Sequence, residues 1–158
     1  MTLRAVFAGL AVAACVPQSS PPPAADPAVV AAEIAAQFDT LSVAVIRHDW
    51  DQVEATFADG DDVTLAMDGV LTVGRSAIMA GFRADSSILA YLEYRWEDPR
   101  IRLLGANAAV HSTGFRERLA MRSGDTVAIQ GTWTNAFQRI DGRWRIVHMA
   151  ASHRPASP

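Results

Sequence analysis

The chain has 158 residues, half of them apolar and a fifth charged, so it is long enough for one globular domain and too apolar to be disordered. Its net charge of −3 argues against nucleic acid as a partner, which needs a basic face, and leaves no polybasic patch for anionic lipid. The single cysteine excludes an internal disulfide and a structural cysteine site for zinc.

The first fourteen residues have the pattern of an export signal. One positive charge, Arg4, precedes an apolar run from residue 5 to residue 14. This run is too short to span a bilayer, which takes about 20 residues, but it has the length of the hydrophobic part of a signal peptide. It ends in Val12-Ala13-Ala14-Cys15, which resembles the bacterial lipobox, where a lipidated cysteine becomes the new N-terminus. Ordinary cleavage near residues 11–13, or a buried N-terminal helix, are the alternatives.

Lipidation of Cys15 would place the chain in the bacterial cell envelope. Residues 1–14 are then the signal peptide and residues 15–25, rich in proline, a tether between lipid and domain. Position 16 is Val rather than Asp, which departs from the pattern for inner-membrane retention and favours the periplasmic side of an outer membrane where two membranes are present. Outside the cytoplasm, nicotinamides and nucleoside triphosphates are not expected, and we expect no cofactor.

The first half of the domain is predicted to be mostly helical. Apolar residues at helical spacing predict a long helix over residues 26–48, opened by Asp26 and Pro27, which suit an N-cap and a first turn. A second, short helix follows Asp49 and ends by Gly60. Alternation then predicts a hairpin over residues 63–73 with its turn at Asp68-Gly69, followed by a third helix over residues 76–82.

The second half of the domain is predicted to consist of β-strands. Strands are predicted over residues 89–104, 108–121, 126–140 and 143–152, with an irregularity at Pro99 and a last hairpin around Asp141-Gly142. The order of helix, helix, hairpin, helix and a run of antiparallel strands predicts an α+β fold, with three helices packed on one face of an antiparallel sheet.

The last hairpin resembles a known family signature. Residues 131–137 form a threonine-rich strand, and they are followed by an Asp-Gly turn, Trp144, the pair Val147-His148 and Ser152. This pattern resembles the closing segment of the nuclear transport factor 2-like superfamily. It is most similar to the SnoaL-like branch and to the association domain of calcium/calmodulin-dependent kinases.

The resemblance covers residues 26–155, leaving residues 156–158 as a tail, and implies a cone-shaped cavity between a curved antiparallel sheet and the three helices. It also implies a homodimer formed through the sheet. It does not specify an activity, because the superfamily includes isomerases, cyclases, dehydratases and assembly domains. Asn135 and Ala150 replace an Arg and a His of the kinase-type pattern, which makes the pocket less charged and disfavours a carboxylate ligand.

Pairing across the last turn suggests which side chains line the cavity. A two-residue turn at Asp141-Gly142 places Asn135 opposite His148, and cross-strand partners share a face. The larger and more aromatic face is assigned to the cavity, although a β-bulge would reverse part of the assignment. Its predicted members are Trp133, Asn135, Phe137, Trp144, Ile146, His148 and Ser152.

Few of these residues suggest chemistry. Asn135 and His148 are either a structural hydrogen-bonded pair or ligand contacts, and His148 is the candidate general acid or base because imidazole titrates near neutrality. Ligand-binding candidates are Asn135, Trp133, Phe137, Ile146 and Tyr94. Glu93 and Glu117 are the strand carboxylates that could enter the cavity. No metal site is predicted, because His148 and His153 point to opposite faces.

Three functions remain open from sequence. The first is an envelope protein that binds a small, largely apolar molecule in the cone. The second is an isomerase, cyclase or dehydratase that uses His148. The third is a dimeric interaction module that uses the outer face of the sheet.

Overall fold

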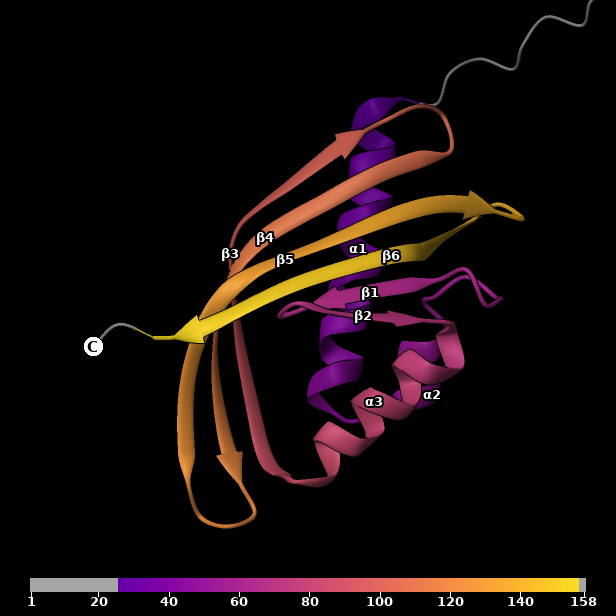
Figure 1. The fold of residues 1–158 in the computed structure, drawn as a ribbon. Coiled ribbons are helices and arrows are strands. Elements are labelled where there is room, and N and C mark those ends of the chain that lie inside the picture. Colours follow the sequence, from indigo (N-terminus) through magenta and orange to yellow (C-terminus); the bar gives the residue numbers. More distant parts are fainter. Residues whose placement is uncertain (1–25, 157–158) are drawn as a thin grey trace, which may run out of the picture.

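The computed structural model describes residues 26–156, so the predicted signal peptide and the whole predicted tether, Cys15 included, lie outside the described residues. Three helices and six strands follow one another in the predicted order (Figure 1). Their bounds are α1 Pro27–Ile46, α2 Trp50–Glu54, β1 Thr64–Met67, β2 Val70–Val73, α3 Arg75–Ser87, β3 Leu89–Leu103, β4 Ala108–Met121, β5 Thr126–Ile140 and β6 Arg143–Pro155. The α+β fold is confirmed, and α3 extends five residues beyond its predicted end.

Helix α1 is the long core helix of the domain. The Asp26 carboxylate accepts a hydrogen bond from the Ala28 amide at 2.9 Å, which caps the first turn, and Pro27 occupies the first helical position. Its apolar stripe is buried against the sheet at Val30, Ile34, Phe38 and Leu41. By length and hydropathy alone α1 could also cross a membrane, but the core helix of a globular domain has the same composition.

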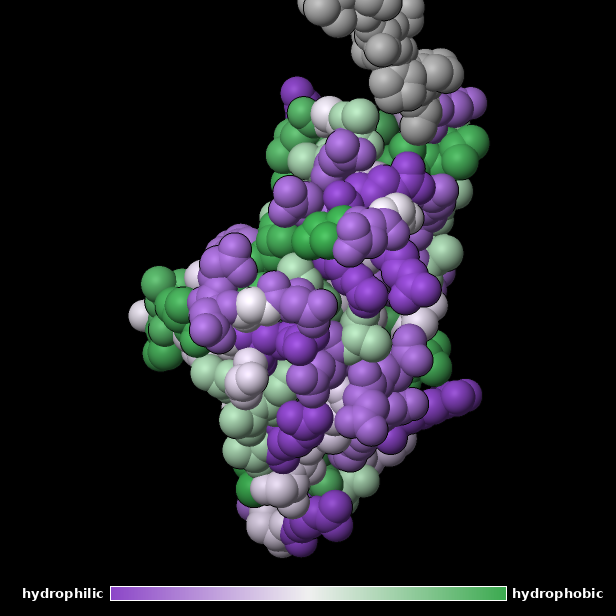
Figure 2. All heavy atoms as spheres, turned by 90° about the vertical axis from the view of Figure 1, so that its right-hand side faces the viewer, coloured by the Kyte–Doolittle hydropathy of each residue, from purple (hydrophilic) through white to green (hydrophobic). Residues whose placement is uncertain are grey.

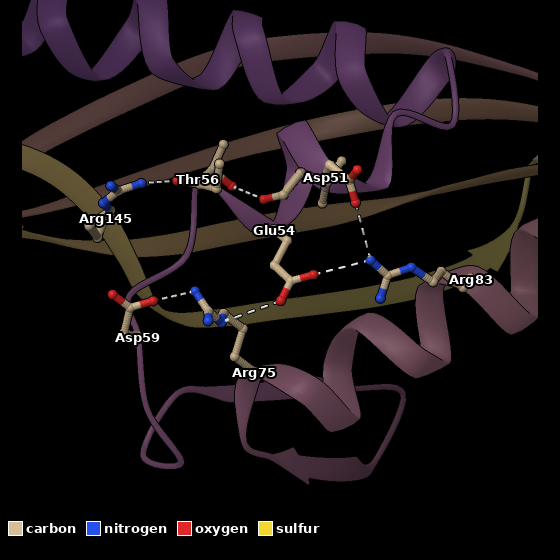
Figure 3. A network of polar contacts seen from close by, with 9 residues as sticks. Asp51, Glu54, Thr56, Asp59, Arg75, Arg83 and Arg145 are labelled. Atoms are coloured by element: carbon tan, nitrogen blue, oxygen red, sulfur yellow. Dashed lines mark hydrogen bonds and ion pairs between the residues drawn. The ribbon is translucent and has the colours of Figure 1, made fainter.

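A network of ion pairs joins α2 to α3 (Figure 3). Arg83 of α3 lies 3.1 Å from Glu54 and 3.7 Å from Asp51, both on α2. Arg75, at the start of α3, lies 3.7 Å from Glu54 and also contacts Asp59 in the loop after α2. These side chains are partly exposed, so the network orients the two short helices more than it stabilises the fold.

The six strands form one curved sheet in the order β2-β1-β6-β5-β4-β3, and α1 lies across its concave side (Figure 1). Four of the five strand pairs are antiparallel, as predicted. The pair of β1 with β6 is parallel, which corrects the prediction of a wholly antiparallel sheet. The long return through α3 and β3–β5 brings β6 beside β1 in this direction, and the sheet does not close into a barrel.

Both predicted two-residue turns are present. Asp68 and Gly69 have φ values of 49° and 85°, and Asp141 and Gly142 have 49° and 76°. Positive φ at both central positions is the geometry of a type I′ hairpin, which Asn or Asp followed by Gly favours.

A β-bulge in β6 changes the pairing of the last hairpin. Phe137 pairs with Ile146, but Ala136 pairs with His148, so Val147 is an extra residue on β6. The predicted pairing is right from the turn to Ile146 and wrong beyond it, because one inserted residue exchanges the faces of every later side chain. Met149, Ala151 and His153 therefore face the concave side, and His148, Ala150 and Ser152 face outward.

Hydrophilic side chains cover most of the face on which α2 and α3 lie, with apolar ones gathered in separate patches (Figure 2). Among the exposed apolar residues are Val70, Leu71 and Val73 of the edge strand β2. The apolar core lies between α1 and the concave side of the sheet.

Candidate cavity site

A cavity of about 400 Å³ lies between the concave face of the sheet and the helices. Its lining comes from α1, α2, α3, strands β1 and β3–β6, the turn after β1 and the residues that follow α1 and α3. Apolar side chains dominate, and no arginine belongs to the lining; the chain has no lysine. The lining residues are Phe38, Leu41, Ser42, Val45, His48, Trp50, Val53, Met67, Asp68, Phe82, Asp85, Ser86, Ile88, Leu89, Leu92, Tyr94, Trp96, Glu117, Leu119, Met121, Ile129, Trp133, Met149 and His153.

Aromatic rings form one wall of this cavity. Tyr94 and Trp96 stack with ring centroids 4.9 Å apart, and Trp96 meets Trp133 edge to face at 6.2 Å. Phe38 of α1 packs against the edge of Trp96 at 4.8 Å. Such pairs hold one another in fixed orientations, so the wall is ordered before any ligand arrives.

One histidine is held by an aspartate at the edge of the cavity. The carboxylate of Asp68 accepts a hydrogen bond from the backbone amide of His153 at 2.8 Å, and its other oxygen lies 2.7 Å from Nδ1 of the same residue. The backbone hydrogen bond, together with the side-chain contact and the attraction of His153, holds the pKa of Asp68 below its ordinary value. Because Nδ1 is engaged, Nε2 is the ring nitrogen left to meet a ligand.

A buried glutamate lies on the neighbouring strand of the same cavity. Glu117 of β4 is 7% exposed and pairs with Tyr94 of β3 in the sheet register. Burial raises the pKa of Glu117, and a hydrogen bond donated by the Tyr94 hydroxyl and the nearby His153 oppose that rise in part. Burial and the neighbouring Glu117 raise the pKa of Tyr94, so this phenol stays protonated.

The five predicted ligand contacts divide into two groups. Trp133 and Tyr94 line the cavity. Asn135, Phe137 and Ile146 are at most 2% exposed and do not line it; they belong to the packed interior behind the aromatic wall. There the Trp133 indole donates a hydrogen bond to Asn135 Oδ1 at 3.1 Å.

His148 is not among the cavity-lining residues. Its Nδ1 lies 2.8 Å from the Thr64 hydroxyl of β1, and it pairs with Ala136 in the sheet. The bulge at Val147 turns it to the outer face, so the expected pairing with Asn135 is wrong and its acid–base role loses its geometric basis. The structural alternative, a hydrogen-bonded histidine, describes its surroundings better.

Sequence reasoning passed over His153 and Asp68. Asp68 is the first residue of a predicted Asp-Gly turn. For His153 the sequence predicts only that its side chain faces the side of the sheet opposite to that of His148. One signal could have found the bulge: Trp144 and Ile146 are apolar at even positions, whereas after Val147 the largest apolar residue, Met149, stands at an odd position between His148 and Ala150. Glu117, by contrast, was among the carboxylates predicted to be candidates for the cavity.

Within residues 26–156, no three His, Cys, Asp or Glu side chains are grouped as metal ligands would be.

Comparison with known proteins agrees with this geometry. A family model, the SnoaL-like domain, matches residues 34–157. Comparison with curated proteins gives no match. A nuclear transport factor 2-like superfamily protein of Salmonella enterica serovar Typhimurium has 21% identity and a TM-score of 0.75, over 84% of this chain and 95% of that one.

Two further solved structures have the same fold. A Xanthomonas campestris protein that resembles the association domain of calcium/calmodulin-dependent protein kinase II has 22% identity and a TM-score of 0.69, over 92% of this chain and 100% of that one. A hexachlorocyclohexane dehydrochlorinase has 12% identity and a TM-score of 0.70, over 82% and 90%. At these identities the likeness concerns the fold alone.

Proposed function

Because the chain belongs to the SnoaL-like domain family, whose fold often holds small molecules, we propose that it binds a small, largely apolar molecule in its cone cavity. One observation carries the proposal: about 400 Å³ of space is walled by aromatic and aliphatic side chains, with a few polar groups gathered at Asp68, His153, Glu117 and Tyr94. This combination of an apolar pocket with few convergent polar groups is typical of small-molecule sites.

A neutral fluorescent probe tests whether the cavity takes up apolar molecules. N-phenyl-1-naphthylamine should gain fluorescence with the wild-type domain. Leu119 lines the cavity from β4, so Leu119→Trp should fill part of it and weaken probe binding at least ten-fold. The adjacent Arg118 is exposed on the opposite face of the same strand, so Arg118→Trp is the matched control and should bind as the wild type does. Equal binding by both variants, each shown to be folded by circular dichroism, would place the probe elsewhere.

Acid–base catalysis is a second candidate, favoured by the contact between Asp68 and His153. An imidazole oriented through Nδ1 presents Nε2 as a base for proton transfer. His153 thus takes the role that sequence reasoning gave to His148. In such a step a C–H bond next to a carbonyl breaks, the proton moves to Nε2 of His153, and the resulting enolate then takes a proton back from the imidazolium.

Deuterium exchange tests this candidate without knowledge of the natural substrate. Incubation of 2-tetralone with the protein in D₂O should speed deuterium uptake at the carbon next to the carbonyl, as followed by NMR. His153→Gln should abolish the acceleration, and His148→Gln, which changes the same residue type on the outer face, should leave it intact. No acceleration by the wild-type protein would remove this candidate and leave ligand binding standing.

Lipid attachment at Cys15 stays part of the proposal. It is supported by the lipobox-like segment before Cys15, which is the chain's single cysteine, and by the proline-rich residues that follow. Stable anchoring requires more than one acyl chain, which lipoprotein processing would supply. Mass spectrometry should find an acylated N-terminal Cys15 in the membrane fraction of a bacterial host, and Cys15→Ser should abolish this form. A wild-type mature chain that begins at another residue would contradict the anchor.

A homodimer through the outer face of the sheet also stays a proposal. Small and apolar side chains adjoin one another there, with Val110 opposite Ala136 and Thr134 opposite Ala150 in the sheet register. Sedimentation equilibrium should show a dimer that Ala136→Arg dissociates. A wild-type monomer at high concentration would count against it.

A further inference from the structure

The cavity has an excess of acidic groups over basic ones. Asp68 and Glu117 lie beside one histidine, His153, so this cluster has a formal charge of −1 even when the imidazole is protonated. Asp85 adds a further carboxylate to the lining. The other titratable groups that line the cavity are Tyr94 and His48.

Glu117 in particular has no cation within ion-pair distance among residues 26–156, because the nearby imidazole of His153 is paired with Asp68. Asp68 is paired with His153, but no ion pair of Glu117 is formed within residues 26–156. The arginines of β4, Arg116 and Arg118, point to the outer face of the same strand. Buried carboxylates are normally paired, because an unpaired charge in a dry pocket is costly.

Two helices also direct their negative ends toward this space. Ser42 and Val45 in the last turns of α1 line the cavity, as do Asp85 and Ser86 in the last turn of α3. Neither helix carries a basic residue in its last turn. The C-terminal end of a helix attracts positive charge. At α3 Arg122 already meets this end, because its Nε donates to the Ser87 carbonyl oxygen at 2.9 Å, and Arg47 directly follows α1.

The aromatic side chains that line the cavity also favour a positively charged ligand. Tyr94 and Trp96 of β3 and Trp133 of β5 form an aromatic wall on the two strands that flank β4, which carries Glu117. Trp50 and Phe82 lie on the helical side. The faces of such rings attract cations as well as apolar groups.

We propose that the cavity selects a ligand with an apolar or aromatic body and one positively charged nitrogen, which pairs with Glu117. This rests on the proposed binding function and names the class of ligand. The amine supplies the counter-ion that Glu117 lacks, and the aromatic wall surrounds the apolar body. Because burial raises the pKa of free Glu117, amine binding stabilises its charged form and releases a proton where the free acid is protonated.

Three probes with one ring system test the charge preference by isothermal titration calorimetry. Tryptamine carries an ammonium group, tryptophol a neutral hydroxyl group, and indole-3-acetate a carboxylate. We expect tryptamine to bind at least ten-fold more tightly than tryptophol, and indole-3-acetate to bind most weakly. Titration of tryptamine at mildly acidic pH in buffers of different ionisation enthalpy should show net proton release.

Two isosteric variants locate the effect. Glu117→Gln keeps the shape and removes the charge, so it should abolish the preference for tryptamine over tryptophol while leaving tryptophol binding nearly unchanged. Glu93, an exposed glutamate on the outer side of β3, gives the control Glu93→Gln, which should keep the preference.

Two results would overturn the amine proposal. The first is equal or tighter binding of tryptophol, which would mean that protonated Glu117 donates to a neutral oxygen. The second is failure of all three probes to bind. N-phenyl-1-naphthylamine then separates the two hypotheses: if it binds in the cavity, the proposed binding function stands and only the amine preference fails.

Discussion

Gly131 of β5 occupies a place where even one methyl group cannot fit. A Cβ built there would lie 2.8 Å from Cζ of Phe115 and would collide with the carbonyl oxygen of Ser152 on β6. Overfilling a packed interior costs typically about 1–3 kcal/mol, and here one of the obstructing atoms is backbone, which yields less readily than a side chain. We therefore expect Gly131→Ala to lower the free energy of unfolding by about 3 kcal/mol or more.

Urea denaturation followed by far-UV circular dichroism measures this change. Gly81 in α3 provides the matched control, because it is exposed and a Cβ there would have no atom within 4 Å. Gly81→Ala should stabilise the domain by about 0.5–1 kcal/mol, since alanine is the better helix former. A Gly131→Ala protein as stable as the wild type would show that β5 and β6 separate easily, and would undermine the fixed placement of His153 beside Gly131.

Three further predictions concern stability. Burial lowers the pKa of His111, which is 1% exposed, although the charge of Asp39 opposes this in part. As pH falls, the histidine is therefore protonated in the unfolded chain before it is protonated in the folded one. The free energy of unfolding should decrease as pH drops below about 6.5. His111→Leu should make unfolding less dependent on pH between 5 and 7.5, and an unchanged slope in urea titrations would contradict this. Leu41→Ala should cost about 2–5 kcal/mol in the same assay, because the side chain is 4% exposed within the core, and a loss under 1 kcal/mol would mean that α1 packs loosely. Arg83→Ala should cost less than about 1 kcal/mol and lose that effect in high salt, since its ion pairs are partly exposed; a loss that salt leaves unchanged would point to packing instead.

The fold could be predicted from local patterns because they agree with one another. Asp26 and Pro27 mark the start of α1, the spacing from Val30 to Leu41 marks its buried side, and two Asp-Gly turns fix two hairpins. The parallel pairing of β1 with β6 could not be read in this way. It depends on a return from a distant part of the chain, which no local periodicity encodes.

The candidate site was predicted less well, for a physical reason. Trp133 of β5 and Tyr94 of β3 lie on other strands than the bulge in β6, which therefore does not change their facing, and both line the cavity as expected. His148 lies one residue after the bulge, so its predicted facing is reversed. A bulge leaves only a change of phase in a short stretch of residues, which is easily missed beside strong turn signals.

The register of β6 after its extra residue also bears on how the cavity lining could change in evolution. The end of β6 carries two alternating sets of side chains: Met149, Ala151 and His153 face the concave side, where Met149 and His153 line the cavity, and His148, Ala150 and Ser152 face the exterior. Insertion of one residue between His148 and Met149 would move every later residue by one place in the register, exchange the two sets and put Ser152 opposite Gly131, where His153 now lies. One insertion, with no substitution at the site, would thus give a pocket of different chemistry.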